Sequence, residues 1–120
     1  MKRSLAMAAF LPCLLAGFPS ARAQEAQEVA EGRAIAVKVC AICHVAAQDQ
    51  TQAPQLNPPA PPFAEIAARP NVTEAFLRDF LMKPHGEARS LSAMPGFLVP
   101  GPRADAVIVY LMSLRPRPRP

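Results

Sequence analysis

Apolar positions recur at helical spacing in several short segments of the chain, and proline-rich loops separate these segments. Residues 27 to 39 contain no proline, and Val29, Ile35 and Val39 recur there among many alanines. This pattern predicts an amphipathic helix. Residues 48 to 62 begin polar and then become dense in proline, which predicts an extended loop. The segments that flank this loop are too short to be separate domains, so we expect it to wrap on a shared core.

The second half of the chain predicts three further helices. Residues 63 to 68 can form a short helix before Pro70. The next helix can be capped by Asn71 or Thr73, and Pro84 ends it. The apolar side chains of this helix share one face; they are Phe76, Leu77, Phe80 and Leu81.

The last predicted helix spans about residues 103 to 114. Pro102 suits its start and Pro116 its end, and its apolar residues recur at the spacing of a buried stripe. A strand over residues 107 to 109 is the alternative, but no other segment offers that strand a partner. The segments together predict an all-α fold.

The first 23 residues have the pattern of a secretory signal peptide. Two basic residues precede an apolar run over residues 5 to 18, and Ala21-Arg22-Ala23 predicts cleavage after Ala23. The run of about 14 residues is shorter than the roughly 20 that a spanning helix needs, and Pro12 interrupts it. A retained membrane anchor is therefore the weaker alternative, and the sequence predicts export to the periplasm, an oxidising compartment.

Removal of this segment changes the composition of the chain. Of the remaining 97 residues, 46 are hydrophobic and 17 of these are alanine, which is a thin supply for a self-sufficient core. A cofactor that supplies buried surface would compensate for this shortage. The net charge of +4 also does not describe the predicted cytochrome domain, because residues 24 to 114 hold seven positive and nine negative side chains. No nucleic-acid partner is expected.

Cys40-Ala41-Ile42-Cys43-His44 has the C-x-x-C-H pattern of covalent haem attachment. On a helical turn the two thiols lie on nearly one face, where they can add to the two vinyl groups of one haem. The histidine that follows is then held beneath the iron as its proximal ligand. The motif predicts one covalent haem c, attached through Cys40 and Cys43 and ligated by His44.

Three other interpretations of the cysteines are weaker. A thioredoxin-like redox pair would follow a strand in a βαβ pattern, which this chain lacks. A zinc site would need two further ligands, and the chain offers only His85. A disulfide between Cys40 and Cys43 leaves the adjacent histidine without a role. Cys13, the third cysteine, lies in the predicted signal peptide.

The second axial ligand has to come from a later residue. Met94 lies in a predicted loop, and the Pro-Gly pair that follows it suits a thioether directed at the iron. Met82 and Met112 lie in predicted helices, where a methionine more often fills the core. His85 is the rival ligand, although a loop histidine is more often an exposed surface residue. We expect Met94 to ligate the iron, with His85 or an open site as the alternatives.

The chain after residue 23 resembles the class I cytochromes c, in particular the small bacterial periplasmic monohaem type, essentially from end to end. The resemblance rests on Gly32, the C-x-x-C-H motif, residues 60 to 67, the Met94-Pro95 pair and the C-terminal helix with Tyr110. It implies three to four helices wrapped with loops around one haem. It also implies that the first and last helices cross at Gly32, with Tyr110 packed on this glycine.

The resemblance further implies a partner for the proximal histidine. In this family a proline carbonyl accepts a hydrogen bond from Nδ1 of the histidine, which fixes the ring and tunes the iron. By its place before Phe63, that proline is Pro61, with Pro62 as the neighbouring alternative. Ala60 stands where relatives usually have glycine. Arg69 and Arg89 are candidates for contact with the haem propionates.

These observations predict a periplasmic one-electron carrier rather than an enzyme. No catalytic residue is proposed, because both axial positions are filled and the chain is too small for a second site. Two alternatives stay open. The chain can be the cytochrome subunit of a periplasmic dehydrogenase or oxidase complex, or a gas-binding or peroxidatic haem protein with an open sixth site.

Residues 24 to 114 form the predicted cytochrome domain, and an Arg-Pro tail follows over residues 115 to 120. Alternating arginine and proline cannot form a helix, so we expect an extended, solvated tail. Docking to an acidic partner or an anionic surface is the functional alternative to a tail without a role. The expected partners are donor and acceptor redox proteins, with no membrane-spanning segment after signal cleavage.

Overall fold

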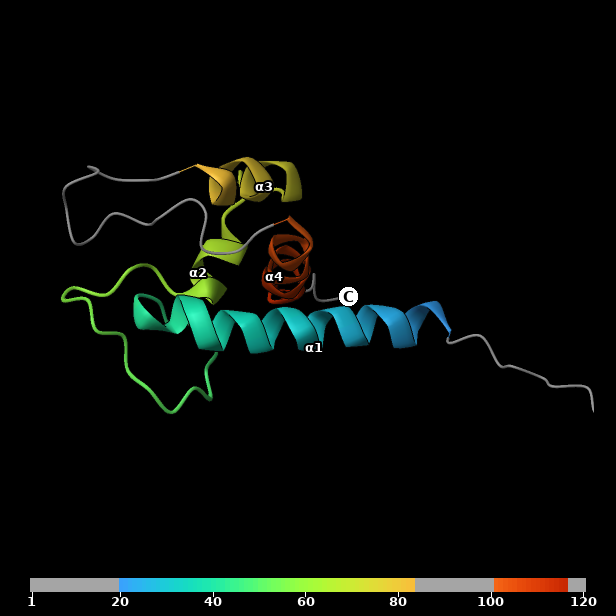
Figure 1. Ribbon diagram of the computed structural model, residues 1–120. Helices are drawn as coiled ribbons and strands as arrows, with labels where there is room; N and C mark the ends of the chain where they lie inside the picture. The colour runs from blue at the N-terminus through green and yellow to red at the C-terminus, as the bar shows by residue number, and fades with distance from the viewer. Residues whose placement is uncertain (1–19, 84–100, 117–120) are drawn as a thin grey trace, which may run out of the picture.

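The structure is a computed structural model that describes residues 20–83 and 101–116. The described residues form four α-helices and a 3₁₀ helix, with no strand among them, which confirms the all-α prediction. The long helix α1 lies across the bundle and α4 packs against it, while α2 lies beside α4 and α3 lies on the side of α4 away from α1 (Figure 1). The bounds are α1 Ala21–Val39, 3₁₀ helix Cys40–Ile42, α2 Phe63–Ala68, α3 Glu74–Met82 and α4 Gly101–Ser113.

Helix α1 begins at Ala21, six residues before the predicted start at Gln27. Ser20 caps it by accepting a hydrogen bond from the N–H of Ala23, and alanine, glutamine and glutamate in its first turns are good helix formers. Residues 21 to 28 are all exposed, so the core does not support this part of the helix. Figure 1 shows this end of α1, in blue, projecting past α4.

The later helices lie close to their predicted ranges. Helix α2 has the predicted bounds, and Thr73 rather than Asn71 caps α3, because its hydroxyl accepts the N–H of Phe76 at 3.1 Å. Helix α4 begins two residues earlier than predicted, at Gly101, whose positive φ of 29° turns the chain into the helix. Residues 107 to 109 are helical, so the alternative strand is excluded.

The crossing of α1 and α4 forms the centre of the core. A Cβ atom at Gly32 would overlap the carbonyl group of Ala106 and would lie 2.8 Å from Cβ of Tyr110. Only glycine therefore allows this approach of the two helices. The hydroxyl of Tyr110 donates a 2.9 Å hydrogen bond to the carbonyl of Ala46, which ties the following loop to the crossing. The crossing lies where the family resemblance implies it.

Residues 43 to 62 form a loop that includes the predicted loop over residues 48 to 62. The side chain of Gln50 holds its first turn, accepting the N–H groups of Ala46 and Ala47 at 2.7 and 3.1 Å. An ion pair of 2.6 Å between Arg33 and Asp49 ties the loop to α1. None of the helices in the described residues is long and apolar enough to cross a membrane.

Candidate functional site

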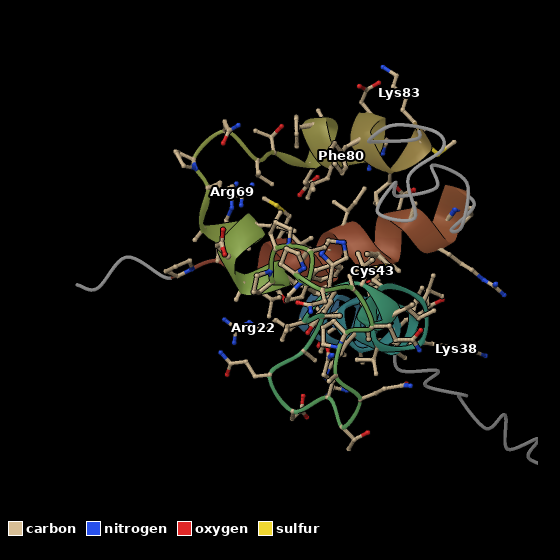
Figure 2. The ribbon with its side chains drawn as sticks, turned by 90° about the vertical axis from the view of Figure 1, so that its left-hand side faces the viewer. Arg22, Lys38, Cys43, Arg69, Phe80 and Lys83 are labelled. Carbon is tan, nitrogen blue, oxygen red and sulfur yellow. The ribbon has the colours of Figure 1, made fainter. Side chains whose placement is uncertain are left out.

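The 3₁₀ helix at the end of α1 carries the first cysteine of the motif. The N–H groups of Cys43 and His44 both donate to the carbonyl of Cys40, at 3.0 and 2.9 Å. These two hydrogen bonds fold the motif back on itself. As a result Cys40 and His44 line the same cavity, while Cys43 is half-buried at the end of α1 (Figure 2).

The ring of His44 is held by the loop segment that precedes α2. Nδ1 of His44 donates a 2.7 Å hydrogen bond to the carbonyl of Pro61, not to that of Pro62. A carbonyl only accepts, so Nδ1 carries the ring proton and Nε2 keeps a lone pair for a metal ion. Phe63 packs edge-on against the ring, with 5.4 Å between the ring centroids.

Two backbone hydrogen bonds hold this segment in place beside the motif. The N–H of Ala60 donates to the carbonyl of Cys43 at 2.9 Å, and the N–H of Phe63 donates to that of Val45 at 3.0 Å. Ala60 also forms an isolated parallel bridge with His44. Among the described residues no residue other than glycine has a positive φ. The backbone at Ala60 therefore does not require the glycine that relatives usually have there.

The cavity beside His44 has mostly apolar walls from α2, α3, α4 and the loops between them. Its polar exceptions include Asn71 and Arg69, and the guanidinium of Arg69 is paired with Glu65 at 2.8 Å. Its apolar lining is Ala60, Pro61, Phe63, Ile66, Val72, Phe76, Leu77, Phe80, Leu81, Val107, Ile108 and Leu111. A flat apolar group with an iron at its centre fits a space that has a thiol and a free imidazole nitrogen on one wall.

Burial determines the chemistry of the first thiol. Cys40 is buried, and loss of hydration raises the pKa of its thiol to about 11, with a smaller contribution from Cys43. Cys40 is therefore a neutral thiol near neutral pH. In the described part of the chain no group of three His, Cys, Asp or Glu residues could hold a metal ion.

Several predicted residues lie outside the described ranges. These are Met94, His85, Arg89 and Cys13, together with the predicted signal sequence up to residue 19. Met82, the last residue of α3, is 57% exposed and does not fill the core as a helical methionine usually does. Met112 packs against the core as expected.

The sequence pattern did not reveal that two phenylalanines of α3 are exposed. Phe76 and Phe80 stack at 5.5 Å between ring centroids, and both line the cavity, yet they are 42% and 37% exposed. Their helical spacing predicted a buried stripe, of which Leu77 alone is fully buried. A cofactor in the cavity accounts for both the stripe and the exposure, because it would cover these rings.

Comparison with known proteins gives a relative that matches most of the chain. Cytochrome c-552 of Bradyrhizobium diazoefficiens (strain USDA 110) is 34% identical over 105 residues, which cover 87% of this chain and 92% of the relative. No family model matches the chain. No solved structure gives a significant match.

Proposed function

The chain belongs to the class I c-type cytochromes, whose cofactor is covalently bound haem c, and from this premise we propose a periplasmic one-electron carrier with His/Met ligation. Cys40 and Cys43 would attach the haem, and His44 and Met94 would ligate its iron. The bound haem supplies an iron that cycles between the ferric and ferrous states.

One observation carries this proposal. The 2.7 Å hydrogen bond from His44 to Pro61 leaves Nε2 free on a cavity wall that also holds Cys40. The bond to the Pro61 carbonyl also orients the ring and makes Nε2 a stronger donor. The apolar walls exclude water, and a methionine ligand raises the reduction potential, so the chain's own residues favour the ferrous state.

The assignment of Met94 rests on its position in the sequence. Leu81, near the end of α3, lines the cavity, and Met94 follows α3 in the sequence. Met82 and Met112 are less suited, because Met82 is exposed outside the cavity lining and Met112 packs against the core.

The optical spectrum of the ferric holoprotein tests the axial ligands. A His/Met haem has a weak red charge-transfer band, and we expect Met94→Ala to abolish this band while Met82→Ala keeps it. Survival of the band in Met94→Ala would show that another residue is the ligand. Carbon monoxide binding by the native ferrous protein at neutral pH would instead favour a gas-binding or peroxidatic haem protein.

The periplasmic location rests on the basic and apolar pattern of the first 23 residues. The predicted cleavage site after Ala23 lies in the exposed first turn of α1, ahead of the crossing at Gly32. Cleavage there leaves intact every core residue that the described part of the chain contains. A mature protein that begins at Gln24 is the direct consequence.

A further inference from the structure

The loop that follows the C-x-x-C-H motif is folded around the side chain of Gln50. Its amide oxygen accepts the N–H groups of Ala46 and Ala47, at 2.7 and 3.1 Å. Its amide nitrogen donates to the carbonyl of Gln52 at 2.7 Å and to the carbonyl of His44 at 3.4 Å. A side-chain amide has two N–H donors and an oxygen that accepts twice, so Gln50 uses its whole hydrogen-bonding capacity on this backbone.

The backbone that Gln50 binds is removed from water. Ala46 is 0% exposed and Ala47 is 6% exposed, and Gln50 itself is half-buried. Buried backbone N–H groups need a hydrogen-bond acceptor, because water cannot reach them without opening the structure. The amide oxygen of Gln50 therefore takes the place that water would otherwise occupy in this turn.

The same stretch of backbone is also held by two distant segments. The carbonyl of Val45 accepts the N–H of Phe63 at 3.0 Å, and the carbonyl of Ala46 accepts the hydroxyl of Tyr110 at 2.9 Å. The backbone directly after the proximal histidine is thus fixed from three sides, by the start of α2, by α4 and by Gln50.

This backbone carries the imidazole of His44. The ring is fixed at Nδ1, which donates to the carbonyl of Pro61 at 2.7 Å, and the main-chain carbonyl of the same residue accepts from Gln50. A side chain that is held both at its ring and at its backbone has little freedom to turn. The direction of Nε2 therefore depends on Gln50 as well as on Pro61.

The residue type alone does not identify Gln50. The loop contains four glutamines, and all of them are in the described part of the chain: Gln48, Gln50, Gln52 and Gln55. Of these four, Gln50 is the one whose side chain binds the backbone after His44.

We propose that Gln50 is a positioning residue for the proximal iron ligand. Its amide fixes the backbone after His44, and in this way it sets the direction of the imidazole and keeps water away from this side of the site. The proposal rests on the proposed function, in which His44 ligates the haem iron. Exclusion of water favours the less charged ferrous state, so Gln50 raises the reduction potential.

The test compares two methionine variants of the holoprotein. Gln50→Met keeps the length of the side chain but removes its four hydrogen bonds. Gln48→Met is the matched control, because it makes the same change at an exposed position of the same loop. Amide hydrogen exchange at Ala46 and Ala47 should be about tenfold faster in Gln50→Met and unchanged in the control.

Two further measurements report on the iron ligand rather than on the loop. The haem-methyl shifts in the ¹H NMR spectrum of the ferric protein depend on the orientation of the axial imidazole, and we expect Gln50→Met to change their spread. Voltammetry should give a lower midpoint potential for Gln50→Met, since water then replaces the amide. Gln48→Met should match the parent in both measurements.

Gln50→Glu is a milder variant that separates the two halves of the amide. A carboxylate oxygen can still accept from Ala46 and Ala47, but the side chain can no longer donate to Gln52 or His44. We expect both amides to keep slow exchange and the haem-methyl shifts to lie between those of the parent and those of Gln50→Met. Exchange as fast as in Gln50→Met would overturn the amide oxygen as the group that holds this backbone.

The outcomes distinguish Gln50 from the proposed function. If Gln50→Met exchanges faster at the loop but keeps the haem-methyl shifts and the midpoint potential of the parent, Gln50 only holds the loop and the proposal is overturned. Equal effects of Gln48→Met and Gln50→Met would overturn it as well. A parent protein without a reversible one-electron wave would instead overturn the proposed function.

Discussion

Individual side chains in this protein are positioned by partners far away in the sequence. His44 donates to Pro61, 17 residues later, and Tyr110 donates to Ala46, 64 residues earlier. Both bonds end on backbone carbonyls of the loop over residues 43 to 62, part of which lines the cavity. These two side chains therefore hold this loop in place.

Tyr110 gives a pH-dependent test of this arrangement. Burial raises the pKa of its phenol above the ordinary value of about 10. The charge of Arg33 lowers this pKa and that of Asp49 raises it, each with a smaller effect than burial. The folded state therefore holds the proton more tightly than the unfolded state. Its contribution to stability is fully present below the unfolded pKa and is lost as the pH rises through the folded pKa.

The measurement is a pH titration of the ¹³C-labelled phenol by NMR, which is unambiguous because the chain contains one tyrosine. We expect a midpoint above the ordinary value. Tyr110→Phe should lower the free energy of unfolding by about 1 kcal/mol near neutral pH, since it leaves the Ala46 carbonyl without its donor. A midpoint at or below the ordinary value would contradict the buried, hydrogen-bonded phenol.

The elements are held together mainly by one close helix crossing. Helix α1 meets α4 at Gly32, and an exposed ion pair of 2.9 Å between Arg78 and Asp105 links α3 to α4. Because exposed ion pairs contribute at most about 1 kcal/mol, the crossing matters more for stability. The apolar stripe of α4 faces α1 and the cavity at the same time.

Gly32→Ala tests the crossing. Alanine would favour an isolated helix by about 1 kcal/mol, but its Cβ would overlap the Ala106 carbonyl, so the helices would have to separate. We expect a net loss of about 1–3 kcal/mol in the free energy of unfolding, measured by denaturant titration of the holoprotein.

The matched control lies two residues along the same helix. Ala34 is exposed, and Ala34→Gly should cost only about 1 kcal/mol through lost helix propensity. Adding a methyl group and removing one should thus both destabilise the protein, for different reasons. A stabilising Gly32→Ala would mean that the two helices do not approach this closely.

For the whole molecule, the haem cavity replaces much of an ordinary core. Buried hydrophobic residues are mostly small, and Ile108 and Val107 are the largest side chains that are fully buried among the described residues. Phe76 and Phe80 lie exposed over the cavity. The apolar cofactor therefore has to supply buried surface that the chain does not provide.

Omission of the haem should therefore unfold most of the chain. We expect Cys40→Ser/Cys43→Ser protein, produced without attached haem, to lose most of its helical circular dichroism and its cooperative thermal transition. Met94→Ala holoprotein is the control, because it keeps the covalent haem and should keep the helices. A haem-free chain that melts cooperatively would show that the protein core is sufficient by itself.

The sequence by itself determined the helices, the haem motif and the cofactor, because each depends on spacing within one short segment. The C-x-x-C-H run, the proline positions and the helical stripes are signals of this kind. The early start of α1 was missed, since the core does not support its first turns and a serine cap with good helix formers sustains them.

Only the tertiary structure decided which distant groups meet. It selected Pro61 over Pro62 as the acceptor for His44, left Phe76 and Phe80 exposed over the cavity, and placed Arg115 against Val72. These contacts join segments that are separated by long stretches of chain. Periodicity describes one segment at a time, whereas the meeting of two segments depends on how the whole chain packs.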